Sequence, residues 1–144
     1  MTSEAMEKVL RDVVAEFRAD MGTIHLLEEN DGALHLAALV GNIPVAVRAA
    51  VEIVPIGKGI AGEAAHRREP VSICNIQQDT SGVTRPGAKT IGTQGALCVP
   101  MLAGNRLVGT LGVGCNGERT FTEEETQRMM EIGKRLAEEM KPSP

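Results

Sequence analysis

Cysteines are the side chains in this sequence best suited to redox chemistry. Cys74, Cys98 and Cys115 are odd in number and form neither a CxxC pair nor a Cys/His spacing typical of zinc. Cys98 lies in an apolar run, where burial raises the pKa of a thiol and makes it unreactive. We therefore expect three reduced thiols with packing or incidental roles, and Cys74 is the best redox candidate among them.

Histidines are the second group that could carry chemistry, since neutral imidazole is a common ligand of metals and of haem iron. His25 and His35 fall in two neighbouring apolar runs, where they could face each other, and His66 lies further on. The first two alternate with apolar residues such as Ile24 and Leu36, as exposed residues of half-buried strands do. We expect exposed histidines and no metal or haem cofactor.

A candidate ligand site follows Cys74. Residues 75 to 95 form the longest stretch without a sustained period, and long loops in compact domains are uncommon and often functional. Arg85 could hold a carboxylate, nitrate or phosphate through a fork of hydrogen bonds. A solvated loop would have the same composition, so both interpretations stay open. The candidate ligand-binding residues are Cys74, Asp79, Thr84, Arg85 and Lys89.

The segment Gly57-Lys58-Gly59-Ile60-Ala61-Gly62 is a candidate anion site. Glycines let backbone N–H groups converge, and the start of a helix favours negative charge. The spacing is not that of a P-loop. We expect a turn that leads into a closely packed helix, with Lys58 on the surface.

Composition narrows the class of protein. With 144 residues, 42% of them hydrophobic and 24% charged, the chain can form one hydrophobic core. A net charge of -4 and scattered basic residues argue against nucleic acid, and two aromatic residues leave little for base stacking. No apolar run approaches the roughly 20 residues of a membrane span, and no signal peptide is evident. We expect a cytoplasmic protein.

Hydrophobic periodicity predicts the elements that must position these side chains. A helix with one apolar face is expected over 3–19 and a hairpin over 23–27 and 33–39 around an Asp-Gly turn. Shorter elements follow: a helix over 44–51, a helical stretch over 60–66 and a strand over 70–74. A second hairpin spans 96–102 and 106–113. The last helix begins at Thr122, with a capping box to Glu125, and ends before Pro142.

This order of elements predicts an α+β fold with a mainly antiparallel sheet flanked by helices. We expect a single domain over 1–144 with a core from about 6 to 140. Several segments, in this order, resemble the GAF domain family: 22–27, 56–62, 69–73, 96–101 with 109–113, and 121–125.

The resemblance implies a profilin-like, PAS-related fold with the N- and C-terminal helices packed on one face of a central sheet. Loops and short helices would cover the other face and hold a small ligand there. The resemblance also implies that the terminal helices pair between subunits, giving a homodimer that signals to a separate output protein or domain. The apolar stripes on both helices agree with this, although covering the sheet explains them equally.

Two ligand classes of the family fit poorly. The motif of cyclic-nucleotide-binding members is matched loosely by Asn116, Phe121 and Glu125, but Gly117 stands where a lysine is expected and Thr126 replaces the final acid. Bilin attachment needs a suitably placed cysteine, often beside histidine, and no cysteine here has a neighbouring histidine.

One enzymatic branch resembles the chain, the free methionine-R-sulfoxide reductases, whose chemistry needs a low-pKa cysteine and a resolving cysteine. The chain has Ala61 where that family has a cysteine, and no cysteine in the loop after Cys74. We therefore expect a regulatory small-molecule sensor and not an enzyme. The alternative is a ligandless dimerisation or protein-interaction module, and a reductase is the least favoured reading.

Overall fold

A computed structural model of the chain describes residues 1–43, 45–74 and 94–140. In this part of the chain, six strands form one sheet in the order β3-β2-β1-β6-β5-β4, and the paired strands are antiparallel. The strands are β1 (Met21–Leu27), β2 (Ala33–Val40), β3 (Ile53–Pro55), β4 (Val71–Ile73), β5 (Gly95–Ala103) and β6 (Arg106–Cys115). The helices are α1 (Ser3–Glu16), α2 (Val45–Glu52), α3 (Gly59–Arg67) and α4 (Glu123–Glu139).

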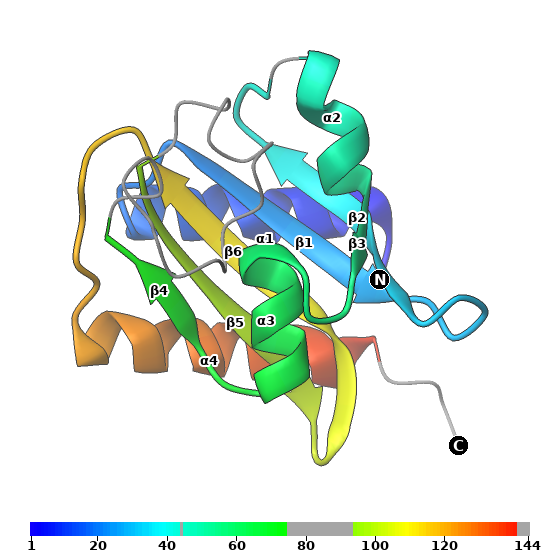
Figure 1. Cartoon of the computed structure of the whole chain (residues 1–144). Coiled ribbons are helices and arrows are strands. Elements are labelled where there is room, and N and C mark those ends of the chain that lie inside the picture. Colours follow the sequence, from blue (N-terminus) through cyan, green and yellow to red (C-terminus); the bar gives the residue numbers. More distant parts are fainter. Residues whose placement is uncertain (44, 75–93, 141–144) are drawn as a thin grey trace.

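The helices at the two ends of the chain cover one face of the sheet. In Figure 1, α1 crosses behind β1 and β2, while α4 lies behind β5 and β6, in agreement with the contacts between these elements. Their apolar stripes pack with the side chains of the same sheet face into the main core, which includes Leu10, Ile24, Val99, Leu111 and Met129. This arrangement confirms the predicted position of the terminal helices.

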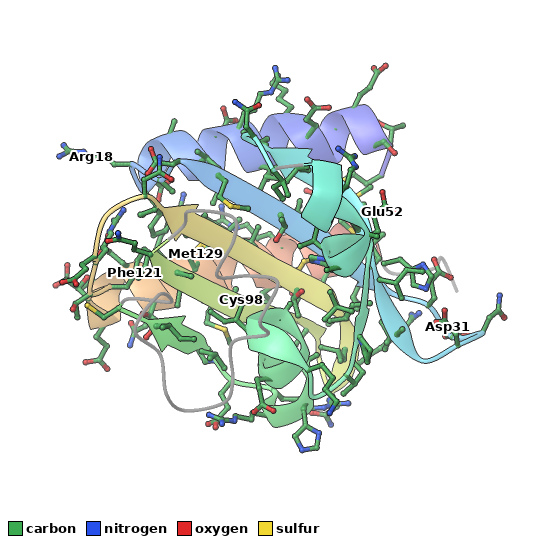
Figure 2. The ribbon with its side chains drawn as sticks, turned by 45° about the horizontal axis from the view of Figure 1, so that its top comes forward. Arg18, Asp31, Glu52, Cys98, Phe121 and Met129 are labelled. Atoms are coloured by element: carbon green, nitrogen blue, oxygen red, sulfur yellow. The ribbon has the colours of Figure 1, made fainter. Side chains whose placement is uncertain are left out.

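The opposite face carries the short helices. α3 packs on β5, β6 and β4, and a second, smaller core forms there from Ala61, Ala64, Val71 and Cys98. Cys98 lies under α3, whereas Met129 belongs to α4 on the far side of the sheet (Figure 2). Small residues in α3 allow this close packing, since a Cβ added at Gly62 would stand 2.5 Å from the carbonyl oxygen of Pro55.

Both predicted hairpins are present. The first turns at Asp31-Gly32, where the Asp31 carboxylate accepts from the N–H of Ala33 at 2.9 Å and Gly32 has a φ of 67°. The second turns at Gly104, with a φ of 62°. The expected α+β fold is therefore confirmed, with an additional short edge strand, β3, that the sequence pattern did not reveal.

The helix ends follow the capping signals in the sequence. Thr122 and Glu125 form the predicted capping box at the start of α4. α1 ends at Glu16, three residues before the expected boundary, because Arg18 adopts a left-handed φ of 53°. No helix within the described ranges is long and apolar enough to cross a membrane.

Candidate functional site

A polar cluster lies in the middle of the sheet face that carries α2 and α3. His25 of β1 pairs in register with Thr110 of β6, and Thr23 pairs with Gly112 two residues along the same strands. His25 is 3% exposed and Thr110 is fully buried. The equivalent positions on the other face, such as Ile24 and Leu111, are apolar core residues. The two faces of the sheet therefore differ sharply in polarity at its centre.

His25 is held by α2. Its Nε2 lies 2.8 Å from the carbonyl oxygen of Val51, near the C-terminal end of that helix. A carbonyl oxygen only accepts hydrogen bonds, so Nε2 carries the proton and Nδ1 presents a lone pair. That Nδ1 is buried and has no hydrogen-bond partner in the described residues. Burial lowers the pKa of His25. The hydrogen bond to Val51 raises the pKa and the nearby His35 lowers it, but burial is the largest influence, so the ring is neutral at pH 7.

The expectation of exposed histidines in the first hairpin is wrong for His25. Leu26 lies opposite His35 and His25 lies opposite Leu36, so the two histidines do not face each other across the hairpin; a β-bulge lies between His25 and Ile24. His35 is half-buried and pairs with the Asp31 carboxylate at 2.7 Å. His25 is buried on the face where its ring meets the Val51 carbonyl oxygen of α2, and no local pattern in the strand signals that contact.

Thr110 is the second unsatisfied polar group of the cluster. Its hydroxyl is buried and makes no hydrogen bond of standard geometry within the described residues, although it lies close enough to the Cys98 thiol to interact weakly with it. Its neighbour Cys98 is also buried, and burial raises the pKa of that thiol to about 12, while the nearby Thr110 hydroxyl acts in the opposite direction. The inert, protonated Cys98 thiol expected from the sequence is therefore confirmed.

Gly112 is a buried glycine of β6 beside this pair. A Cβ added there would lie 3.4 Å from Thr23 Oγ1 and 3.5 Å from Cys98 Sγ, which are ordinary contacts among the described atoms. Gly109 differs, because a Cβ there would stand 2.0 Å from the carbonyl oxygen of His25. Packing thus requires glycine at 109, whereas at 112 the described atoms would be in ordinary contact with an added Cβ and do not by themselves require a glycine.

The candidate residues from the sequence fall in different places. Asp79, Thr84, Arg85 and Lys89 lie outside the described residues, so their role as ligand contacts stays a prediction. Cys74 directly follows β4 and is exposed; its Sγ accepts from the Thr120 hydroxyl at 3.6 Å, and its carbonyl oxygen accepts from the Arg119 N–H at 3.1 Å. The described residues contain no group of three side chains placed to hold a metal ion.

The glycine-rich segment before α3 is a turn. The N–H of Gly57 donates to Gly62 at 2.8 Å, and the N–H of Lys58 donates to Pro55 at 3.1 Å. These backbone donors are engaged internally, and the side chain of Lys58 is exposed, as expected. The geometry favours the turn over the anion cradle.

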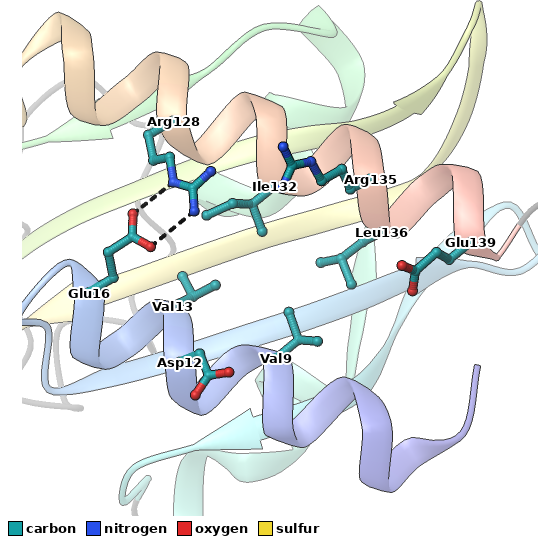
Figure 3. Close-up of a pocket in the computed structure, with 9 residues that line it drawn as sticks. All are labelled: Val9, Asp12, Val13, Glu16, Arg128, Ile132, Arg135, Leu136 and Glu139. Carbon is teal, nitrogen blue, oxygen red and sulfur yellow. Dashed lines mark hydrogen bonds and ion pairs between the residues drawn. The ribbon is translucent and has the colours of Figure 1, made fainter.

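A groove between α1 and α4 is a second feature of functional interest. It has a volume of about 220 Å³ and is open to solvent. The bidentate ion pair of Glu16 with Arg128, at 2.9 and 3.2 Å, closes one end of it (Figure 3). Its walls are Val9, Asp12, Val13 and Glu16 on α1, and Arg128, Ile132, Arg135, Leu136 and Glu139 on α4.

Arg119 is a structural residue that no sequence motif singled out. Its guanidinium donates to the carbonyl oxygen of Phe17 and to Glu125 Oε2 at 2.5 Å, and it lies 4.4 Å from the centroid of the Phe121 ring. It also contacts Cys115 Sγ at 3.4 Å. One side chain thus joins the end of α1, the end of β6 and the start of α4.

A protein-family model described as GAF domain matches residues 2–138. Comparison with curated sequences gives no match.

Similar solved structures include a GAF domain and two reductases. The GAF domain of the Acinetobacter phosphoenolpyruvate-protein phosphotransferase has a TM-score of 0.79 and 20% identity, covering 96% of this chain and 81% of that one. The free methionine-R-sulfoxide reductase of Neisseria meningitidis, in complex with its substrate, has a TM-score of 0.79 and 17% identity, covering 94% and 75%. The type II enzyme of Thermoplasma acidophilum has a TM-score of 0.74 and 17% identity, covering 94% and 89%. At these identities the likeness shows a shared fold alone.

Proposed function

The chain belongs to the GAF domain family, and from this premise we propose that it is a regulatory domain in signal transduction that senses a small molecule. The ligand binds on the sheet face that carries α2 and α3. Both short helices contact this face, and it is the face that the family resemblance associates with ligands.

The observation that carries this proposal is the polarity of the sheet centre. A face built only to pack against helices would be apolar at its centre, as the face under α1 and α4 is. The α2 and α3 face instead has two buried polar groups without a hydrogen bond of standard geometry among the described residues, beside the buried Gly112. Such groups cost stability and call for an explanation, and a ligand that pairs with them supplies one.

A thermal-shift screen tests the proposal. The panel contains cyclic nucleotides, free amino acids including methionine sulfoxide, nitrate and other small anions, and haem. We expect one compound to stabilise the protein saturably, by about 2.7 kcal/mol at a concentration 100 times its dissociation constant. Arg85→Ala tests separately whether the loop residue contributes to that binding.

Matched variants locate the site. Gly112→Val fills the space beside Thr23 and Cys98 and should abolish the stabilisation. Gly117→Val introduces the same side chain at an exposed glycine with no described atom within 4 Å of the added Cβ, and should leave the response unchanged. A flat response of the wild type across the panel would contradict the sensor function.

The second candidate function is dimerisation through α1 and α4, with or without a ligand, and the groove between these helices favours it. Its lining includes the apolar Val9, Val13 and Leu136; the charged residues are acidic on α1, whereas α4 contributes two arginines and Glu139. Asp12 lies on α1 and Arg135 on α4, and neither has a recorded ion pair among the described residues. A second copy related by a two-fold axis would place each α1 against the other α4 and pair these charges. The molar mass in solution tests this against the 15.3 kDa of one chain.

A reductase activity is not proposed, despite the two reductases of similar fold. Ala61 is a buried residue of α3 and offers no thiol, and the Cys98 thiol has a pKa of about 12. Cys74 is exposed but has no recorded thiol neighbour among the described residues. Consumption of methionine sulfoxide with matching oxidation of protein thiols would overturn this view.

A further inference from the structure

We propose that His25 and Thr110 form a subsite for an uncharged group that donates one hydrogen bond and accepts another, such as a primary amide or a hydroxyl. This inference rests on the proposed function, because it assigns a chemical class to the part of the ligand that reaches the centre of the sheet.

His25 supplies a fixed acceptor. The Val51 carbonyl oxygen lies 2.8 Å from Nε2 and requires a proton there, so the neutral ring can only accept at Nδ1. Burial is the largest influence on His25 and lowers its pKa, which keeps Nδ1 unprotonated near neutral pH. A ligand atom at Nδ1 must therefore be a donor.

Thr110 supplies the complementary group. Its hydroxyl makes no hydrogen bond of standard geometry to a described residue, with the weakly accepting Cys98 sulfur beside it, and it lies on the strand position that pairs with His25. Side chains at paired positions of neighbouring strands lie about 4.5–5.5 Å apart at their Cβ atoms. One small ligand group can thus reach both residues, giving a hydrogen to Nδ1 and accepting one from the Thr110 hydroxyl.

The surroundings select against charge. Thr23 and Gly112 are uncharged, and the Cys98 thiol, with a pKa of about 12, stays protonated at neutral pH. These groups offer a carboxylate or a phosphate no counter-charge, and a buried charge without a partner is costly. Gly112 has no side chain of its own, and a Cβ added there would contact Thr23 Oγ1 and Cys98 Sγ at 3.4 and 3.5 Å, so a larger residue at this position would crowd the same polar groups.

Acetamide and acetate are the probes that test this inference, because they have nearly the same shape and differ in charge. Titration is followed by the two-dimensional amide NMR spectrum of the full chain. We expect acetamide to shift the signals around His25 and Thr110 saturably, and acetate to bind at least tenfold more weakly.

Variants separate the two hydrogen bonds. Thr110→Val keeps the shape of the side chain without the hydroxyl, and Thr110→Ser keeps the hydroxyl. His25→Gln can still donate to the Val51 carbonyl oxygen but lacks the acceptor at the position of Nδ1. We expect Thr110→Val and His25→Gln to weaken acetamide binding at least tenfold and Thr110→Ser by less than threefold.

Thr110→Val should also unfold at a higher temperature than the wild type without ligand, because it removes a buried hydroxyl that has no described partner. The dispersion of the NMR spectrum shows whether each variant is folded. A stable, folded Thr110→Val that has lost acetamide binding would support the subsite.

The outcomes distinguish this inference from the proposed function. If acetate binds as well as acetamide, or if Thr110→Val and His25→Gln bind acetamide like the wild type, the subsite is wrong. If Gly112→Val no longer binds a compound from the thermal-shift panel while Thr110→Val and His25→Gln bind it like the wild type, the sensor function stands and the subsite is wrong. If neither the panel nor acetamide binds the wild type, both are wrong.

Discussion

At the scale of single residues, Arg119 shows how one side chain can join distant parts of the chain. Its guanidinium contacts Phe17, which is more than 100 positions away in sequence, and Glu125, which is six positions away. It also lies over the ring of Phe121. A planar fork of donors can satisfy a carbonyl oxygen and a carboxylate together, whereas the ammonium of lysine cannot reproduce this geometry. The side chain of Arg119 is 22% exposed, so these bonds are partly shielded from water.

We predict that Arg119→Lys lowers the free energy of unfolding by about 1–3 kcal/mol, since a partly buried acceptor loses its donor. Urea denaturation measures the change. Arg106→Lys is the matched control: Arg106 makes a 3.7 Å pair with Glu29, which is 88% exposed, and should change stability by less than about 0.5 kcal/mol. Equal losses in the two variants would argue against a special role for Arg119.

His25 shows why part of the candidate site could not be predicted from the sequence. Its alternation with Ile24 and Leu26 correctly indicates that it faces the other side of the strand. Whether that side meets water depends on α2, which follows in the chain only after β2. A period of two specifies the face of a strand but not what covers it.

At the scale of elements, the start of α4 combines a cap with a pH-sensitive group. The Thr122 hydroxyl accepts from the Glu125 N–H at 3.1 Å, and the Glu125 carboxylate accepts from the Thr122 N–H at 2.9 Å. The hydrogen bond from the Thr122 backbone lowers the pKa of Glu125 below 4.5. Partial burial raises this pKa, and Arg119 lowers it further. Because the folded state favours the carboxylate, this stabilisation is present above pH 4.5 and is lost as the pH falls through the lowered value.

We predict that Glu125→Gln is less stable than the wild type at pH 7, by about 0.5–2 kcal/mol, and that the difference shrinks below pH 4.5. Chemical denaturation at a series of pH values checks this. Glu124→Gln removes a charge from the same turn without touching the capping box, so its stability difference should be smaller. A constant difference between wild type and Glu125→Gln down to pH 3 would refute the coupling.

The four helices and five of the six strands of the described residues were predictable from the sequence, and the short edge strand β3 was not. The two hairpins and both terminal helices follow from spacing, turn residues and the Thr122 cap. β3 has three residues, Ile53–Pro55, too few to show alternation. Pro55 also argues against a strand by pattern, yet it is tolerated because β3 lies at the edge of the sheet.

At the scale of the whole molecule, the charge pattern of the groove between α1 and α4 makes the dimer testable. If Asp12 of one copy pairs with Arg135 of the other, Asp12→Arg and Arg135→Glu should each weaken dimerisation about tenfold. The double charge swap should restore it, as for a directly coupled pair. Sedimentation velocity over a concentration series measures the dissociation constant.

The control for this experiment is Lys134→Glu. It makes the same change of charge as Arg135→Glu, on the residue of α4 directly before Arg135, which does not line the groove. It should leave dimerisation unchanged. Failure of the double swap to recover the wild-type constant would exclude this pairing, and a monomer at all concentrations would exclude the dimer.

The order of strands has a kinetic consequence. Each hairpin closes through a short turn, but the central pair of the sheet joins Ile24 of the first hairpin to Leu111 of the second, from opposite halves of the chain. Pairings so distant in sequence form slowly. The seam between β1 and β6 is also where His25 meets Thr110, so a molecule bound to both residues would span the two halves. Such a ligand would recognise only the completed sheet and would slow the separation of its halves.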